Sequence, residues 1–398
     1  MNPRDELIDA LRGLALFGIL AVNIQCFVTG LAAPSLGILD AQSSRADHVA
    51  VWLTAFLLEF KFYPIFSFCF GYGFAVQMKR WKVAGVPLKQ RFGRRMNAML
   101  FMGLAHGTLL WFGDILTRYA ITGYLLRRYA DCGPRKLLVA AKFWLAIAVG
   151  LMTLFAMFTA LSGSSETAAE LATVKRMMRD DAAQVIAAYT QSSYVDATIQ
   201  RMSDYKSVTL NFVAVIPHFM TIFLFGALAA QLGLLRHPER HRTLWKKMWW
   251  FGIGVGVPVN LIHAWYQYQA SLNPWSPPST VLALVAGELA PIMAMAIVAA
   301  FARYGGLSGW RQIVGLLAPA GRIALTLYVC QSIAMTILLN GFAFGLGATL
   351  RPAALFSVAI AIYVVLIALS HAMRYFDIPG PLETVWRRYT YAQVETRA

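Results

Sequence analysis

The chain has 398 residues, of which 58% are hydrophobic and only 14% are charged, and its formal net charge at pH 7 is +16. Soluble globular proteins carry about 25% charged residues, so this composition excludes an ordinary soluble domain. Apolar runs of about 20 residues recur along the chain, which is the length of a helix that crosses a bilayer. A β-barrel would show short alternating segments instead. We therefore predict an all-α fold, a polytopic integral membrane helix bundle.

The apolar runs predict about ten transmembrane helices. In chain order they cover residues 8–28, 51–78, 95–112, 115–130, 137–161, 209–235, 246–268, 279–303, 312–339 and 353–374. Every second loop between them is basic, and the basic residues cluster at 79–95, 127–136, 236–247 and 303–311. Because cytoplasmic loops of membrane proteins are enriched in Lys and Arg, this alternation predicts that both termini are cytoplasmic. It also accounts for the net charge without a nucleic-acid partner.

The chain is expected to form a single transmembrane domain over residues 1–398. Residues 162–208 read as an extracytoplasmic amphipathic loop, which either lies on the membrane surface, covers a cavity or only connects two helices. Residues 375–398 are expected to form a cytoplasmic or interfacial tail. The four cysteines and the histidines have no metal-ligand spacing, so no metal site is predicted.

Several ionisable or polar side chains fall inside the predicted helices, where each is costly and is therefore a candidate for function. These residues are Asn23, Glu59, Lys61, His106, His218, His263 and Glu288. At a rise of 1.5 Å per residue, their positions along the predicted helices place them at a similar depth in the membrane, on the outer side of its midplane. Such a layer predicts a water-accessible cavity that opens outward. Glu59 and Lys61 point in different directions on a helix, so each is expected to pair with another helix, Lys61 with Asp114 or Glu288.

The stretch "AHGTLLWFGDIL" (105–116) places a histidine and an aspartate at the end of one apolar run. A straight helix separates His106 from Asp114 by about 12 Å, so no direct hydrogen bond is expected between them. Gly113 is predicted to end one helix and Asp114 to cap the next, which gives a tight hairpin. His106, with no local acidic partner, is predicted to act as a base or proton carrier.

Five stretches resemble the YeiB-like family of bacterial inner-membrane proteins, and they follow the order of that family along the whole chain. They are "LIDALRGLALFGILAVNIQCF" (7–27), "KFYPIFSFCFGYGF" (61–74), "GLAHGTLLWFGDILTRYAITG" (103–123), "GRIALTLYVCQSI" (321–333) and "GPLETVWRRYTY" (380–391). The resemblance implies a multi-pass protein of the bacterial inner (plasma) membrane.

The first helix also resembles that of a wider superfamily of transmembrane acyltransferases, which includes heparan glucosaminide acetyltransferase. The shared pattern is Asp9, Arg12, Gly13 and Asn23. In the lysosomal enzyme the active-site asparagine stands where this chain has Asn23. The catalytic histidine that follows it there has no counterpart at the matching spacing here, so the resemblance leaves His106 to take that role.

The resemblance and the charge placement together imply an acyltransferase that uses acyl-CoA as cosubstrate. The acyl group would pass from cytoplasmic acyl-CoA to an extracytoplasmic acceptor hydroxyl or amine of a glycan, lipid or small molecule. The basic inner face would bind the CoA phosphates through Arg12, Arg94, Arg95 and Arg322.

In this hypothesis His106 removes the acceptor proton, and Asn23 donates a hydrogen bond to the thioester oxygen. Asp114 and Lys61 complete the catalytic set, with Lys61 acting through its charge or by holding an acidic partner. The acceptor is expected to contact Glu59, Glu288, His218 and His263. None of these residues is predicted to bind a metal. Membrane lipids are further partners, and the sequence leaves open whether two copies form a homodimer.

Two alternatives remain at this stage. The same charged layer suits a proton-coupled transporter or lipid translocator, for which the glycine-rich "FGIGVGVPVN" (251–260) offers one helix break. A non-catalytic membrane accessory or sensor protein would need neither CoA binding nor alternating access.

Overall fold

The computed structural model describes residues 6–32, 38–162, 168–272 and 287–391, and every regular element in these ranges is helical. The long helices are α1 (Glu6–Thr29), α4 (Phe62–Val83), α5 (Leu88–Leu109), α7 (Pro134–Ser162), α8 (Ala168–Thr190), α9 (Tyr194–Gln231) and α16 (Pro352–Tyr375). The shorter ones are α3 (Arg45–Leu53), α6 (Leu116–Leu126), α10 (Arg242–Gly254), α11 (Gly256–Leu272), α13 (Ile292–Tyr304), α14 (Ser308–Arg322), α15 (Ala324–Leu339) and α17 (Pro381–Tyr391).

Six helical segments among the described residues are long and apolar enough to cross a membrane. They are Glu6–Thr29, Arg45–Val83, Pro134–Phe158, Tyr194–Gln231, Gly287–Tyr304 and Pro352–Tyr375. A seventh is present if α14 and α15, which meet at a bend of 81°, form one span. The chain is thus a polytopic membrane helix bundle, as its composition predicts.

The expected helices differ from the observed ones at five places. The run 51–78 is interrupted between α3 and α4, where Phe60 has a positive φ. The run 115–130 contains the 11-residue α6, which at 1.5 Å per residue is about half the thickness of the hydrocarbon core. The run 95–112 ends at Leu109, the run 246–268 is divided between α10 and α11, and the run 312–339 is sharply bent. Hydropathy records how apolar a segment is, and it does not record where the chain turns inside the apolar region.

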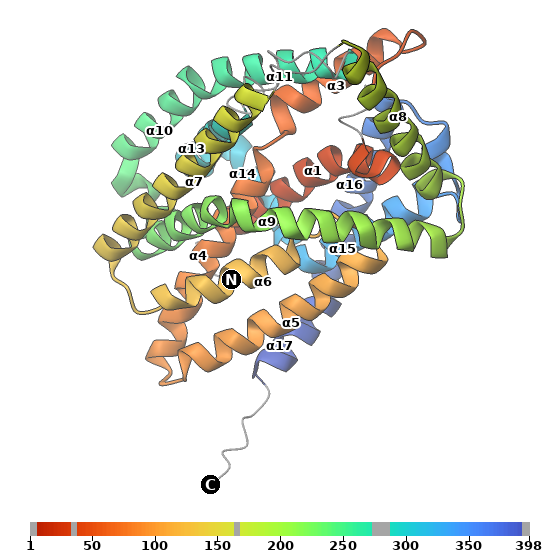
Figure 1. The fold of residues 1–398 in the computed structure, drawn as a ribbon. Helices are drawn as coiled ribbons and strands as arrows, with labels where there is room; N and C mark the ends of the chain where they lie inside the picture. The colour runs from red at the N-terminus through yellow and green to blue at the C-terminus, as the bar shows by residue number, and fades with distance from the viewer. Residues whose placement is uncertain (1–5, 33–37, 163–167, 273–286, 392–398) are drawn as a thin grey trace.

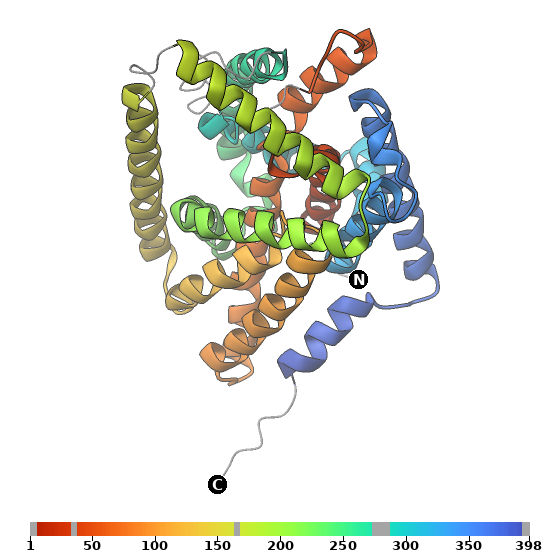
Figure 2. The same ribbon diagram turned by 45° about the vertical axis from the view of Figure 1, so that its right-hand side comes forward.

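Close contacts between backbones hold the centre of the bundle together. A side chain on Gly13 of α1 would collide with the carbonyl group of Leu317 on α14, and one on Gly71 of α4 would collide with that of Phe223 on α9. Small residues at helix contacts allow this approach in membranes, where packing rather than the hydrophobic effect drives helix association. Figure 1 shows α1, α4 and α9 crossing in the middle of the molecule, while α7 stands along its side in Figure 2.

The segment expected as a loop at 162–208 contains α8 and the first turns of α9. α8 packs against the rest of the protein, since the Tyr189 hydroxyl donates to Asp204 at 2.7 Å and the Gly341 N–H donates to the Tyr189 carbonyl at 2.9 Å. Ala182 and Val185 are buried on the same helix. The described part of this segment therefore covers the bundle rather than serving only as a connector.

The end of the bundle that carries α17 is the basic end, formed by residues 79–95, 127–136 and 381–391. In both ribbon views α17 lies beside α5 at this end (Figures 1 and 2).

Candidate functional site

The hairpin of α5 and α6 brings His106 and Asp114 into direct contact. The N–H groups of Leu110 and Trp111 both donate to the His106 carbonyl, at 3.0 and 2.8 Å, so α5 ends and the chain turns back. The turn returns Asp114 to the level of the imidazole, whose Nδ1 lies 2.9 Å from Oδ1 of the carboxylate. The expectation that these two groups stay apart is wrong, because it assumed a straight helix from His106 to Gly113, whereas α5 ends at Leu109.

Asp114 also caps α6. Its Oδ1 accepts the N–H of Leu116 at 3.1 Å, and its Oδ2 accepts the N–H of Thr117 at 2.7 Å. The prediction that Asp114 binds the free N–H groups at the start of α6 is confirmed, although the N-cap position is Ile115, one residue later. Gly113 does not end a helix but lies within the turn. The carboxylate is fully buried, and its hydrogen bonds fix it in one orientation. One side chain therefore both binds the first N–H groups of α6 and contacts His106.

Two residues of α15 complete the surroundings of His106. The Nε2 atom lies 2.9 Å from the Ser332 hydroxyl, and the ring packs on Tyr328 with centroids 4.8 Å apart. The Tyr328 hydroxyl accepts the N–H of Ile115, at 3.3 Å, and so holds the turn against α15. The sequence analysis missed both residues, because nothing in the apolar run of α15 distinguishes them from packing residues.

Helix α9 clamps the same hairpin from the opposite side. The Arg201 guanidinium donates to the carbonyl of Leu109 at 2.9 Å, and the hydroxyls of Tyr205 and Thr117 are 2.7 Å apart. Arg201 is 1% exposed, so a buried guanidinium group stabilises the last turn of α5.

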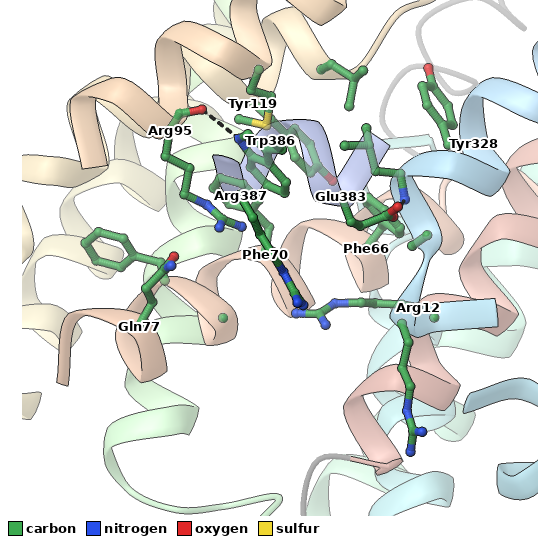
Figure 3. A pocket seen from close by; sticks show the side chains of 18 of the residues that line it. Arg12, Phe66, Phe70, Gln77, Arg95, Tyr119, Tyr328, Glu383, Trp386 and Arg387 are labelled. Carbon is green, nitrogen blue, oxygen red and sulfur yellow. Dashed lines mark hydrogen bonds between the residues drawn. The ribbon is translucent and has the colours of Figure 1, made fainter. Parts of the chain in front are cut away.

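A cavity of about 230 Å³ opens at the basic end of the bundle and extends toward this hairpin (Figure 3). Four arginines line it, Arg12, Arg95, Arg322 and Arg387. Gln77 and Glu383 also line it, and the remaining lining is mostly aromatic or apolar, with Phe66, Phe70, Leu116, Tyr119 and Tyr328. Because Tyr328 both lines the cavity and packs on His106, its ring separates the cavity from the buried dyad.

The structure thus gathers three of the four arginines expected to bind phosphates. Arg94 does not line the cavity, and Arg387, which the sequence analysis did not select, does. Neighbouring groups hold Arg12 in place. Arg12 is 3.1 Å from Asp9 and donates to the Cys69 carbonyl at 3.1 Å.

Helix α17 closes the basic side of this cavity. Its Trp386 stacks under the Arg95 guanidinium at 3.6 Å and donates to the Arg95 carbonyl at 2.9 Å, as the dashed line in Figure 3 marks. Its Glu383 accepts the N–H groups of Leu325 and Thr326, at 2.8 and 3.1 Å, and so caps the start of α15.

A second buried pair lies where the segment Arg45–Val83 is interrupted. Glu59 accepts from Nε2 of His263 at 3.0 Å and from the Gln267 amide at 3.1 Å. Phe60 next to it has φ of 60°, a left-handed conformation that is uncommon for a bulky residue. The expectation that Glu59 finds its partner on another helix is confirmed.

Lys61 does not find the partner that was expected. Its ammonium group donates to the carbonyl of Ala55, at 2.8 Å, within the same interrupted segment. Asp114 is instead bound to His106, and Glu288 lies 3.9 Å from His218. The helix break turns the lysine back on its own chain, which a continuous helix would not allow.

The remaining candidates are placed as follows. His218 shares a hydrogen bond of 2.9 Å with the Tyr63 hydroxyl. Asn23 is half-buried on α1, and its amide makes no hydrogen bond to another described residue. Within the described ranges no hydrogen bond or ion pair connects the cluster around Glu59 with the one around His106. The polar residues that were expected to form one layer therefore form separate groups in the structure.

These observations define the class of the protein, a multi-pass membrane helix bundle with a buried carboxylate–histidine–serine array beside a basic cavity. The family model described as "Protein of unknown function (DUF418)" matches residues 229–393. The uncharacterized protein YxaH of Bacillus subtilis is 32% identical over 98% of this chain and 95% of its own length. The chain therefore belongs to the DUF418 family, the YeiB-like proteins.

Two further bacterial relatives align over nearly the full length. The uncharacterized 39.9 kDa protein in the amylase 3′ region of Bacillus acidopullulyticus is 26% identical over 98% of this chain and 95% of its own. The uncharacterized protein YeiB of Escherichia coli is 24% identical over 97% of this chain and 96% of its own. No solved structure matches the chain.

Proposed function

We propose that this protein is a transmembrane acyltransferase that moves an acyl group from cytoplasmic acyl-CoA to an extracytoplasmic hydroxyl or amine. The observation that carries the proposal is the placement of the Asp114–His106 pair directly behind Tyr328, at the inner limit of an arginine-lined cavity. A histidine oriented by a buried carboxylate is the usual arrangement of a general base.

The cavity suits part of an acyl-CoA rather than the whole molecule. Its volume of about 230 Å³ is below that of pockets for drug-sized ligands, roughly 300–1,000 Å³. The pantetheine arm would lie along Phe66, Phe70 and Tyr119, and the phosphates would remain at the mouth among the arginines. Arginine is well matched to phosphate oxygens because its planar group donates two parallel hydrogen bonds.

The roles of the polar residues follow from this placement. His106 would take the proton of the attacking group, and Asp114 would keep its Nδ1 protonated so that Nε2 is the basic atom. Asn23 remains the candidate donor to the thioester oxygen. Lys61 is assigned a supporting electrostatic role, and the groups around Glu59 and His218 are assigned to the acceptor side.

We further propose that the basic end faces the cytoplasm of a bacterial inner membrane, with both termini on that side. The basic loops support this orientation. The α5–α6 hairpin starts and ends at basic segments, so the alternation of loops is the same whether it crosses the membrane or returns within it. Ten membrane segments, some of them short or broken, remain the proposed count.

The proposal is tested by acyl-CoA binding and CoA release with the purified protein in nanodiscs, using acetyl-CoA and palmitoyl-CoA. Wild type is compared with His106→Ala, Asn23→Ala and the control His241→Ala at the start of α10. We expect all four to bind acyl-CoA, and both His106→Ala and Asn23→Ala to lose most CoA release, by about 10²–10⁴-fold for the base. If wild type binds neither thioester, the acyltransferase proposal is wrong.

A proton-coupled transporter or lipid translocator is the second candidate. The features that favour it are the interrupted helices, namely the 81° bend between α14 and α15 and the break at Phe60, together with the buried Glu59–His263 pair. Broken helices near ionisable groups are typical of transporter binding sites. Acidification of wild-type but not Glu59→Gln proteoliposomes during solute uptake would favour this candidate.

A further inference from the structure

Ser332 stands in line with the His106–Asp114 pair. The Asp114 Oδ1 to His106 Nδ1 distance and the His106 Nε2 to Ser332 Oγ distance are both 2.9 Å. The three residues are 0%, 3% and 1% exposed, respectively. A carboxylate, an imidazole and a hydroxyl in this order form the arrangement that activates serine as a nucleophile in hydrolases of unrelated folds.

The hydrogen bonds around Asp114 determine which nitrogen of His106 carries the proton. The carboxylate already accepts the N–H groups of Leu116 and Thr117, as expected of an ionised acceptor at a helix N-terminus. A carboxylate in that state can only accept, so Nδ1 must donate to it. The lone pair of Nε2 then faces the Ser332 hydroxyl at 2.9 Å, and the single proton of this hydroxyl can be donated either to Nε2 or to the Tyr328 carbonyl at 3.2 Å.

The position of Ser332 along α15 places it one turn beyond Tyr328, the residue that lines the inner limit of the cavity. The residue before Ser332 in the chain is Gln331, which is fully buried, and neither its side-chain nitrogen nor its oxygen has a hydrogen-bond partner among the described residues. A buried amide without partners is costly. An acyl carbonyl group bound on this side of α15 would give the amide nitrogen an acceptor.

We propose that Ser332 carries the acyl group as an ester intermediate, an inference that rests on the proposed acyltransferase function. In the first step Ser332 Oγ attacks the thioester carbon while its proton passes to His106 Nε2. The C–S bond then breaks, and the CoA sulfur leaves with that proton as the thiol. In the second step an acceptor hydroxyl or amine attacks the ester, its proton passes to Nε2, and Ser332 Oγ recovers a proton as it leaves.

This sequence divides transfer into two half-reactions at one carrier. Acyl-CoA reaches Ser332 from the cavity once the Tyr328 ring moves aside, and CoA can leave before the acceptor binds. Because each substrate meets the serine in turn, the two need not occupy the buried site together. Kinetics of this type are termed ping-pong, and they leave a covalent enzyme intermediate that can be trapped.

A purely structural role for Ser332 makes different predictions. Its Oγ also lies 3.2 Å from the Tyr328 carbonyl, a back-bond common for serine within helices. Ser357 on α16 makes the same contact, with the Ala353 carbonyl at 2.9 Å, and is exposed. Ser357→Ala is therefore a matched control that removes a helix back-bonding hydroxyl far from any histidine contact.

The experiment uses the full-length protein in nanodiscs with acetyl-CoA labelled in the acetyl group. The mixture is quenched with acid and digested, and the labelled peptide is identified by mass spectrometry. We expect label on Ser332 in wild type and in Ser357→Ala, with a burst of about one CoA per protein. Ser332→Ala should lose the label and at least about 10³-fold in CoA release.

Ser332→Cys separates chemistry from folding. A thiol at this position should retain the label as a thioester, which neutral hydroxylamine releases, whereas the wild-type oxygen ester resists that treatment. If Ser332→Ala fails to fold, two other results show whether residue 332 carries the acyl group. They are the position of the label in wild type and the hydroxylamine sensitivity of the label in Ser332→Cys.

Two results would overturn the inference. If Ser332→Ala releases CoA within about tenfold of wild type and wild type carries no label, Ser332 only orients His106 and acyl transfer is direct. In that case the proposed function stands. If wild type neither binds acetyl-CoA nor releases CoA, the proposed function fails together with the intermediate.

Discussion

Two carboxylate–histidine pairs, 2.9 and 3.0 Å apart, lie within the described part of the molecule, and they differ in burial and in what surrounds them. In the first, Asp114 is fully buried, and both nitrogens of His106 have a polar partner. In the second, the Glu59 side chain is 24% exposed, and Nδ1 of His263 has no partner among the described residues. Only the first lies against the ring that limits the basic cavity.

The difference shows that proximity of an acid and a histidine does not by itself define a catalytic arrangement. The imidazole must be fixed on one side so that the other nitrogen faces a group that can react. The array of Asp114, His106 and Ser332 meets this condition. The cluster of Glu59, His263 and Gln267, beside the break at Phe60, leaves one nitrogen available for a proton or a ligand.

The largest expected effect separates the two carboxylates. Asp114→Asn retains an oxygen that can cap α6 but removes the acceptor that fixes the His106 tautomer. CoA release should fall by about 10⁴-fold, as for the equivalent change in serine proteases, while the unfolding temperature changes little. Glu59→Gln should retain CoA release within about tenfold. If Asp114→Asn and Glu59→Gln lose CoA release equally, the two carboxylates do not differ in their contribution to activity.

A pair of glycines tests the packing of the two clusters. An added Cβ on Gly103 would collide with Thr117 and with Oδ2 of Asp114, whereas one on Gly287 would lie 3.5 Å from Phe60, an ordinary contact. Gly103→Ala should therefore destabilise the protein by about 1–3 kcal/mol and reduce CoA release, and Gly287→Ala should do neither. Denaturation monitored by tryptophan fluorescence in detergent measures the first effect. A tolerated alanine at 103 would show that the hairpin is not closed there.

A smaller effect is expected at the mouth of the cavity. Arg387→Gln removes one phosphate partner without touching the buried array, so KM for acyl-CoA should rise by about tenfold, and kcat should be nearly unchanged, because a charged hydrogen bond contributes roughly 1.5–3 kcal/mol at most. Arg128→Gln makes the same change in net charge at an exposed position of the basic end. A rise in KM of the same size in both variants would indicate long-range attraction in place of a defined contact.

The smallest effect concerns an exposed ion pair that contrasts with both buried ones. Arg351 donates to Asp40 at 2.8 Å, and this hydrogen bond lowers the pKa of the Asp40 carboxyl. Because the folded-state pKa is the lower one, the contribution to stability is present above the unfolded value of about 3.9 and is lost as the pH falls through the folded value. Asp40→Asn should reduce the acid dependence of the unfolding temperature only slightly, and at pH 7 the change should be barely measurable.

The sequence predicted the class of fold correctly, and it selected several residues that the structure brings close together. Composition and apolar run length determine that the chain is a membrane helix bundle, and the motif around Asp114 identified a helix cap. The charge pattern selected Arg12, Arg95 and Arg322, which line one cavity. Each of these predictions depends on local composition or spacing, which the sequence records directly.

The rest depends on where helices break, and the sequence contains no strong marker of these breaks. The run through "LLWFGD" is apolar and has no proline, so the end of α5 at Leu109 was not predicted, and neither was the bond between His106 and Asp114. Ser332 and Tyr328 reach the site because α15 turns 81° away from α14. Lys61 turns back to its own chain for the same kind of reason.

The position of α17 has a consequence for biogenesis. The ribosome makes this helix after every other helix that borders the cavity, and domains form from the N-terminus onward during synthesis. Until Glu383 arrives, the first N–H groups of α15 lack the partner they have in the finished protein, and Arg95 lacks the indole of Trp386. The nascent bundle therefore holds an open, basic cavity that its own last helix closes. Until α17 is in place, the arginines that line the cavity are more open to the surroundings than they are in the finished protein.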